Sequence, residues 1–382
     1  MQIQQLTVPG GCETYDFSKI ASQDDNGLVL VFGAVARFER ADLAPALRSA
    51  FPKASIVGCT TAGEISGAGV TDDSLTLTAV RFDSATIRTC CEPVPRMQDS
   101  EDAGRRLGAA LAGSDLRYVL VLGDGVGVNG AALVKGVTAC MDPGVSVSGG
   151  LAGDAGKFER TWLVHNELVQ TKVVLAVGFY GNALRVRHGC AGGWTVFGPR
   201  RKVTKVLDNV VYELDGRRIL DMYEEYLGEE AKGLPISGLL YPLAILSENR
   251  EETGIIRTML EINREEGSVA FAGGIDEGSV VQLMCADEAE LIAGAVLSAS
   301  QSRIEAPGPH DALAILISCV GRRLLLEGRV SQEVRAVIRE LGADFRYTGF
   351  YSNGEISPFP PTGRCAFHNE TMTITTLCEA RA

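Results

Sequence analysis

Val57-Gly58-Cys59-Thr60-Thr61-Ala62-Gly63-Glu64-Ile65-Ser66 is the segment that indicates the fold, because its last four residues recur as Gly354-Glu355-Ile356-Ser357. In both copies another glycine, Gly58 or Gly349, lies five residues before the glycine of this tetrad. A run with alternating threonines follows each copy, over residues 73–78 and 370–375. Two linked matches at opposite ends of a chain indicate an internally duplicated unit.

The repeated segment has the pattern of a strand with one polar face. Side chains of an extended strand alternate between its two faces. Glu64 and Glu355 would therefore lie among hydroxyl groups on one face, while Ile65 and Ile356 would point toward a core. Such a face can bind a ligand, but each glutamate could equally cap a helix or pair with an arginine. The sequence leaves both interpretations open.

Strand–helix–strand patterns occur around these segments and at a third place. Apolar runs at 28–32, 118–122 and 313–319 predict buried strands, and helical spacing follows each of them. Ser148-Gly149-Gly150-Leu151-Ala152-Gly153-Asp154 resembles the repeated segment, which suggests a third unit ending in a glycine and an acid. The patterns predict an α/β fold with mixed sheets flanked by helices, in two pseudo-symmetric halves produced by duplication.

The length of the chain predicts two domains. A chain of 382 residues exceeds the size at which a single core usually divides. Residues 185–205 differ in composition from the rest, and Asp215 is placed to cap a following helix over residues 219–227. We therefore expect one domain over residues 1–210 and a second over residues 211–382.

Composition excludes several classes of partner. The net charge is −12 and no basic block occurs, so neither nucleic acid nor an anionic membrane surface is an expected partner. No signal peptide or apolar run long enough to span a membrane is visible, so we expect a cytoplasmic protein without membrane insertion. Ten cysteines occur without a C-x-x-C pair, which indicates reduced thiols.

Gly125-x-Gly127-x-x-Gly130 formally fits a dinucleotide-binding fingerprint between a strand and a helix. The acidic residue expected about 20 positions later is missing, since Val145 lies there. A glycine-rich turn between a strand and a helix accounts for the same residues.

His188 lies in a segment that contains four glycines and Trp194, Phe197 and Arg200. A neutral imidazole beside two aromatic rings would suit haem b or another flat ligand, and an arginine could pair with haem propionates. His188 is therefore a candidate axial haem ligand, and Tyr351 is the rival. A histidine that only bonds to the backbone of a loop explains the segment equally well.

Several of these motifs together resemble the FIST sensory domain. They are Gly58–Ile65, Gly149–Asp154, His188-Gly189 with Gly193-Trp194, Leu214-Asp215-Gly216-Arg217 and Gly349–Ile356, in that order along the chain. Both the N and the C parts of the family are represented, from about residue 28 to residue 377. The resemblance implies a cytoplasmic signal-input protein that binds small ligands such as amino acids.

The resemblance also implies a haem-based possibility. Some members are similar to bacterial haem proteins that respond to nitric oxide and act on histidine kinases or cyclic-di-GMP pathways. This chain has no kinase, cyclase or chemoreceptor segment, so its output would pass to a separate signalling protein, such as a histidine kinase.

We therefore expect a small-ligand sensor. Alternatives are a sensor of an amino acid or other metabolite without haem, an enzyme with a glutamate as general base, and a protein-binding scaffold. The candidate ligand-binding residues are Cys59, Thr60, Thr61, Glu64, Asp154, Trp194, Arg200, Tyr351, Asn353 and Glu355, with His188 as the candidate haem ligand.

Overall fold

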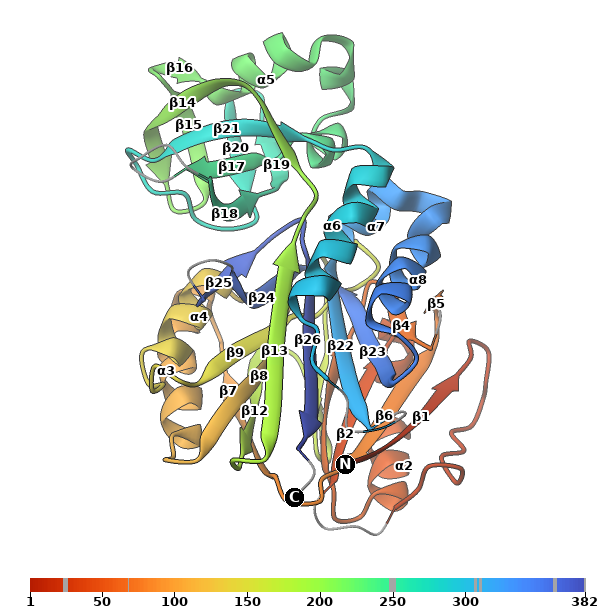
Figure 1. Ribbon diagram of the computed structural model, residues 1–382. Coiled ribbons are helices and arrows are strands. Elements are labelled where there is room, and N and C mark those ends of the chain that lie inside the picture. The colour runs from red at the N-terminus through yellow and green to blue at the C-terminus, as the bar shows by residue number, and fades with distance from the viewer. Residues whose placement is uncertain are drawn as a thin grey trace.

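The computed structural model describes residues 1–22, 27–67, 69–246, 252–305, 308, 311–359 and 363–380. Three six-stranded mixed sheets form the body of the molecule, and a smaller β-rich domain lies at one end of it (Figure 1). The α/β class with mixed sheets flanked by helices is confirmed. Among the described residues, no helix combines the length and the apolar composition needed to cross a membrane.

Four strands of each sheet come from one unit of the chain, and they follow the same order in all three units. The first unit contains β1 (Gln2–Val8), β2 (Gly27–Gly33), α1 (Val35–Phe38), α2 (Leu43–Ala50), β3 (Ser55–Thr60) and β6 (Leu75–Arg81). The second contains β7 (Thr86–Pro93), α3 (Ser100–Leu111), β8 (Leu116–Gly123), α4 (Gly130–Thr138), β9 (Ser146–Leu151) and β12 (Val173–Tyr180). The third contains β13 (Leu184–Ala191), α6 (Glu288–Gln301), β22 (Ala312–Cys319), α7 (Val320–Leu326), α8 (Val330–Leu341), β23 (Phe345–Ser352) and β26 (Met372–Glu379).

Each unit completes its sheet with a hairpin from another unit. The hairpin of β4 (Glu64–Ser66) and β5 (Gly69–Thr71) joins the third sheet, because β4 pairs with β23. The hairpin of β10 (Leu163–His165) and β11 (Leu168–Gln170) joins the first sheet. The hairpin of β24 (Gly354–Phe359) and β25 (Arg364–His368) joins the second. The three units therefore exchange strands in a closed cycle.

The corners between units form a ring of three backbone hydrogen bonds. The amide of Ala62 donates to the carbonyl of Tyr351 at 2.8 Å, and the amide of Gly153 donates to the carbonyl of Thr60 at 2.9 Å. The amide of Asn353 donates to the carbonyl of Leu151 at 3.2 Å and closes the ring. The two Gly-Glu-Ile-Ser segments thus occupy equivalent places, and the segment at 148–154 supplies a third copy. The repeat extends beyond the two expected halves to three units.

A glycine recurs at the same position of all three units, and its recurrence has a steric cause. A Cβ atom on Gly58, Gly149 or Gly349 would lie within 1.8 Å of a carbonyl oxygen on the neighbouring parallel strand. Each glycine lies opposite an apolar residue of an exchanged hairpin: Val164, Ile356 and Ile65, respectively. Glycine at these three positions lets the parallel strands approach where the hairpin joins the sheet.

The three sheets share one core, and helices cover them from outside (Figure 1). Phe32 of the first unit and Phe350 of the third pack within this core, with ring centroids 4.7 Å apart. β2 and β22 are buried along their whole length and β8 at every position except Arg117, as continuous apolar runs in the centre of a sheet require. The two ends of the chain meet, since the N-terminal amine lies 3.3 Å from Glu379.

The helix starts and stops predicted from the sequence are confirmed only in part. Asp287 and Glu290 form the expected reciprocal capping box at the start of α6. Gly342 ends α8 with φ of +95°, as expected for a glycine stop. The expected cap by Asp215 is wrong, because its carboxylate instead accepts from the amide of Lys202 and pairs with Arg201. The helix begins at Ile219, beyond its reach.

The small domain is inserted between β13 and α6 of the third unit. Its elements are β14 (Thr195–Leu207), β15 (Val210–Leu214), β16 (Arg217–Arg218), α5 (Ile219–Leu227), β17 (Leu243–Leu246), β18 (Glu252–Arg257), β19 (Met259–Asn263), β20 (Ser268–Phe271) and β21 (Val280–Cys285). Short 3₁₀ turns at Gly228–Gly233 and Ile236–Leu240 follow α5. The expected boundary between residues 210 and 211 falls at the start of β15, inside this domain.

Candidate ligand-binding site

The two repeated glutamates have matching hydrogen-bond partners. The Thr61 hydroxyl donates to Glu64 Oε1 at 2.5 Å, and the amide and hydroxyl of Ser74 donate to Oε2 at 3.2 and 2.7 Å. Ser352 and Thr371 make the same contacts to Glu355, at 2.7 Å to Oε1 and at 3.2 and 2.9 Å to Oε2. Neither glutamate caps a helix or pairs with an arginine in these contacts.

Both glutamates are buried, and burial raises their pKa values. The pKa of Glu64 lies above its ordinary value because desolvation outweighs the hydrogen bonds from Thr61 and Ser74. The pKa of Glu355 is raised to about 8, again mainly by burial. The strand ends are therefore held by carboxyl groups that bond to hydroxyls and backbone amides.

The acid of the second unit has a different structural role. Asp154 is buried and accepts hydrogen bonds from the amides of Phe158, Glu159 and Arg160 at 2.9, 2.7 and 3.1 Å. These bonds fold residues 154–160 into a compact loop around one carboxylate. We call this segment the Asp154 loop.

A cavity of about 720 Å³ lies where the three units meet beside the first sheet. The chain just after β2 and the corner between β3 and β4 form one side of it. The Asp154 loop forms another side, and Arg323 of α7 enters from the third unit. The lining residues are Ala34, Val35, Ala36, Glu39, Thr61, Ala62, Gly63, Glu64, Asp72, Asp73, Asp154, Ala155, Lys157, Glu159, Arg160 and Arg323.

Charges of both signs line this first cavity. Arg323 donates to the carbonyl of Ala62 and forms an ion pair with Asp72 at 2.6 Å. Arg160 lies 3.9 Å from Glu39 in a second ion pair. The wall is therefore able to bind a carboxylate at one point and an ammonium group at another.

Among the predicted site residues, Thr61, Glu64 and Asp154 line the first cavity. Thr60 lies behind them, and its hydroxyl accepts from the amide of Trp162 at 3.0 Å. Cys59 is fully buried in the central core, where burial raises the pKa of its thiol. The sequence thus identified three residues of the cavity wall and two neighbouring residues that do not line it.

The other predicted residues lie apart from this cavity. Asn353 lines a second, smaller cavity. Glu355 is enclosed at the equivalent corner of the third unit. Trp194 is largely buried and donates from its indole to the carbonyl of Glu370 at 2.8 Å. Arg200 is exposed on β14 of the small domain. Trp194 and Arg200 therefore do not converge with Glu64.

The loop expected around His188 is in fact strand β13, so that prediction is wrong. His188 pairs with Thr375 of β26, and its Nδ1 lies 3.0 Å from the Thr375 hydroxyl. Its ring packs near that of Tyr118, with centroids 5.6 Å apart. Burial lowers the pKa of His188 to about 4, so the imidazole is neutral at physiological pH.

The residues expected to hold haem around His188 do not gather there. Phe197 packs in the small domain, with its ring 6.0 Å from that of Tyr241. Trp194 is bonded to the backbone at Glu370, and Arg200 faces solvent. Phe197 and Arg200 thus belong to β14 of the small domain, whereas His188 lies on β13 of the body. The surroundings of His188 do not fit the group.

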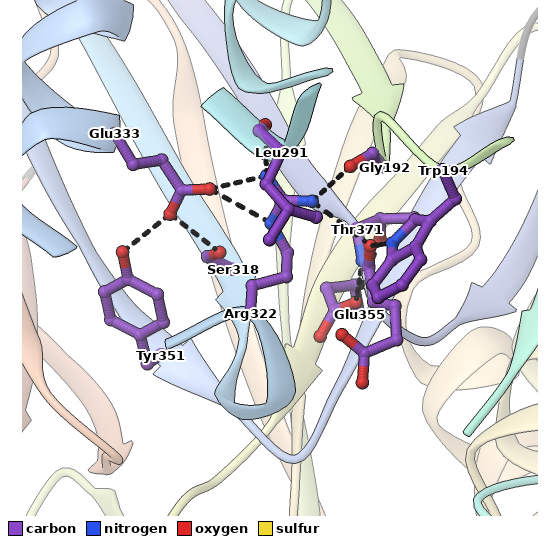
Figure 2. A network of polar contacts seen from close by, with 10 residues as sticks. Gly192, Trp194, Leu291, Ser318, Arg322, Glu333, Tyr351, Glu355 and Thr371 are labelled. Atoms are coloured by element: carbon purple, nitrogen blue, oxygen red, sulfur yellow. Dashed lines mark hydrogen bonds and ion pairs between the residues drawn. The ribbon is translucent and has the colours of Figure 1, made fainter. Parts of the chain in front are cut away.

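Tyr351 belongs to a buried network that sequence analysis missed (Figure 2). Its hydroxyl donates to Glu333 Oε2 at 2.6 Å, and the other oxygen of Glu333 bonds to Arg322. Arg322 also donates to the carbonyls of Gly192 and Leu291, which flank the small domain in sequence. The available signal was the pair Arg322-Arg323, which begins three positions after the end of the buried strand at 313–319. Glu333, the partner of Arg322, lies within a helical pattern, and that pattern gave no indication of the ion pair.

Glu370 is a second buried polar residue that the sequence did not single out. It is fully buried, and burial raises its pKa to about 7. The Thr258 hydroxyl of the small domain donates to one of its oxygens at 3.0 Å. Among the described residues, its Oε2 has no hydrogen-bond partner. Glu370 thus joins the body to the small domain.

The glycine-rich segment forms a turn leading into α4. Asn129 caps this helix by accepting from the amide of Ala132 at 3.0 Å. The amides of Val126 and Gly127 donate to Asp124 at 2.9 and 2.8 Å. These amides are already paired within the turn, which favours the structural interpretation over phosphate binding.

Comparison with known proteins identifies relatives of this chain. Over 196 residues it is 28% identical to the uncharacterized protein MJ1623 of Methanocaldococcus jannaschii. That match covers 47% of this chain and 36% of the relative, so it spans about a third of the relative's length. A cyanuric acid hydrolase from A. caulinodans matches 100% of this chain and 99% of its own, at 9% identity and a TM-score of 0.38. Nothing about activity follows from a likeness this low.

Family models give a broader match. The model of the FIST N domain matches residues 27–217, and that of the FIST C domain matches residues 220–358. Together they cover two of the three exchanged hairpins, most of β24, the first cavity and most of the small domain. The chain belongs to the FIST family, whose domains are associated with sensory signal transduction.

Proposed function

We propose that this protein is a cytoplasmic sensor whose ligand is a small α-amino acid bound in the first cavity. The observation that carries the proposal is a cavity of about 720 Å³ with carboxylates and cationic groups on its wall. A free amino acid carries one ammonium and one carboxylate group, so it needs both kinds of partner at short range.

The cationic side of the wall would receive the ligand carboxylate. Arg323 is fixed by its bonds to Ala62 and Asp72, and Lys157 lies on the Asp154 loop. A guanidinium group held in place binds a carboxylate with little loss of side-chain entropy. Arg323 is therefore the expected anchor, and Lys157 is an additional cation on the wall.

The acidic side would receive the ligand ammonium group. Glu39, Asp73 and Glu159 contribute carboxylates to the wall. Glu64 and Thr61 lie at the corner between β3 and β4, where Glu64 is held by two hydroxyls and an amide. A corner fixed in this way supports precise orientation of a small ligand.

The test is a thermal-shift screen of the purified protein against the twenty L-amino acids, followed by calorimetric titration of those that stabilise it. At least one is expected to bind. Arg323→Gln should weaken that binding at least tenfold, which corresponds to about 1.4 kcal/mol. Lys232→Ala, at an exposed position of the small domain, is the matched control and should leave binding unchanged. The proposal fails if no amino acid binds, or if Arg323→Gln binds as tightly as the control.

The haem-based and the enzymatic alternatives predict different results for the same purified protein. A Soret band in the purified protein would support the haem version, although the surroundings of His188 argue against it. Consumption of the bound amino acid would indicate an enzyme with Glu64 as base. Both oxygens of Glu64 are already bonded to Thr61 and Ser74, which favours a supporting role.

The signal is proposed to pass to a separate protein, for which a histidine kinase is the expectation. A cytoplasmic setting agrees with the ten cysteines, all of which are free thiols. Co-purification of the amino-acid-bound and ligand-free forms with a candidate kinase would test the partner.

A further inference from the structure

A second cavity of about 320 Å³ lies between the body and the small domain. It lies at the end of β8, as the first cavity lies at the end of β2. The turn 125–130 and Asn353 form its wall on the body. Asn209, Leu260 and Gly273 form its wall on the small domain. The two cavities are therefore at corresponding corners of the repeated units but differ in their linings.

We propose that the second cavity is a separate binding site for a small, uncharged ligand with a flat apolar body and an amide-like polar group. This site goes beyond the amino acid proposed for the first cavity. Three features of its lining carry the assignment: a buried unpaired amide oxygen, aromatic walls, and a lack of cationic partners.

The unpaired oxygen belongs to Asn353. This side chain is only 8% exposed, and its Nδ2 donates to the carbonyl of Gly125 at 3.2 Å. That bond fixes the orientation of the amide and leaves Oδ1 buried without a partner among the described residues. Buried amide oxygens in proteins are nearly always paired, so this acceptor calls for an N–H or O–H group from a ligand.

Aromatic and aliphatic side chains supply the walls around that oxygen. Phe158, Phe271 and Phe367 line the cavity together with Leu260. Ligand sites of this kind, mostly apolar with a few placed polar groups, favour flat molecules with one polar edge. Asn129 and Asn209 also belong to the lining, and one atom of each amide is already bonded within the protein, to Ala132 and Phe271.

The charge of the lining excludes anionic ligands. Among the described residues that line the cavity, none is a lysine, arginine or histidine, and Asp208 is the single acid. The amides of Val126 and Gly127 are paired with Asp124 and do not form an anion site. A carboxylate or phosphate would thus be desolvated without a counter-charge.

A ligand here would bridge two parts of the protein. Asn353 and Phe367 belong to the body, whereas Leu260 and Asn209 belong to the small domain. Occupation of the cavity would hold these two parts together. The ligand would thereby control how firmly the small domain is docked.

Two matched pairs of probes test the site: nicotinamide against nicotinate, and benzamide against benzoate. Within each pair the flat ring is kept and the uncharged amide is exchanged for a carboxylate. Saturation-transfer NMR and calorimetric titration of the full chain should show binding of at least one amide. Its acid analogue should bind at least tenfold more weakly.

Variants of residues that line the second cavity test whether the amide probes bind there. Leu260→Trp fills the cavity from a position that is 42% exposed, so the domain should still fold. It should weaken amide binding at least tenfold, whereas Leu207→Trp, at a 64% exposed position of the same domain, should not. Asn353→Leu should weaken the amide and leave the weak binding of the acid unchanged. The proposal is overturned if neither amide binds better than its acid, or if Leu260→Trp binds like Leu207→Trp.

Discussion

Arg322 and Glu333 form a fully buried ion pair, with 2.5 Å between Nη2 and Oε1. Neither side chain has exposed surface, and Tyr351 and Ser318 donate to the second oxygen of Glu333. The guanidinium group bonds at the same time to carbonyls on both sides of the small domain's insertion, Gly192 and Leu291. One ion pair thus joins α7, α8 and the two connections to the small domain.

Breaking this pair from one side should be strongly destabilising. Arg322→Met leaves the Glu333 carboxylate buried without its cation, and about 3–5 kcal/mol of unfolding free energy should be lost. The double variant Arg322→Met/Glu333→Leu removes both charges and should recover part of that loss. Urea denaturation of the two variants and the wild type measures the difference. A double variant no more stable than the single one would contradict this account.

The buried Glu355 should make the protein less stable as the pH rises. Its pKa is raised from 4.5 to about 8, so the folded state binds a proton that the unfolded state has released between these values. Its stabilising contribution is therefore complete below about pH 4.5 and is lost progressively as the pH rises to about 8. Glu370, with a pKa of about 7, adds an effect of the same sign.

Urea midpoints measured between pH 5 and pH 8 test this prediction. Glu355→Gln keeps an uncharged side chain of the same shape, so it should reduce the decline in stability with pH. Glu261→Gln, at an exposed position of β19, is the control and should decline like the wild type. A Glu355→Gln protein that declines as steeply as the wild type would show that this carboxyl is not the source.

The Asp154 loop should couple the two cavities. Lys157 and Glu159 line the first cavity, and Phe158 between them lines the second. Asp154→Asn weakens the acceptor for three backbone amides and should loosen the loop, so affinity for the ligands of both cavities should fall about tenfold, or about 1.4 kcal/mol. Calorimetric titration measures both affinities. Asp142→Asn, at an exposed turn after α4, should change neither, and a loss in only one cavity would refute the shared role.

The glycines opposite the exchanged hairpins should not tolerate a side chain. In Gly349→Ala the new Cβ would lie 1.7 Å from the carbonyl oxygen of Leu316. The strands would have to separate, and the loss of stability should be about 3 kcal/mol, at the upper end of the usual cost of overpacking. Gly144→Ala introduces the same methyl group where no atom lies within 4 Å and should be nearly neutral. Equal thermal midpoints for the two variants would rule out the steric explanation.

Local patterns in the sequence were sufficient for several of the central elements and for the equivalence of the two repeated segments. Continuous apolar runs identified β2, β8 and β22, and the Asp287 capping box located the start of α6. The matching tetrads identified Glu64 and Glu355 as equivalent residues, and their partners at Thr61 and Ser352 lie within three positions. Interactions between near neighbours are encoded in the spacing of residues, so they can be read from the chain.

Only the tertiary structure decided where these segments meet. The exchange of hairpins brings Arg323 to Ala62, which is 261 positions away, and so forms the wall of the first cavity. The setting of His188 was predicted wrongly because its partner Thr375 lies on a strand 187 positions away. Likewise, Asn353 belongs to a cavity completed by the small domain. Sequence spacing specifies which face a side chain occupies on its own strand, but the partner across that face is selected by packing of the whole chain.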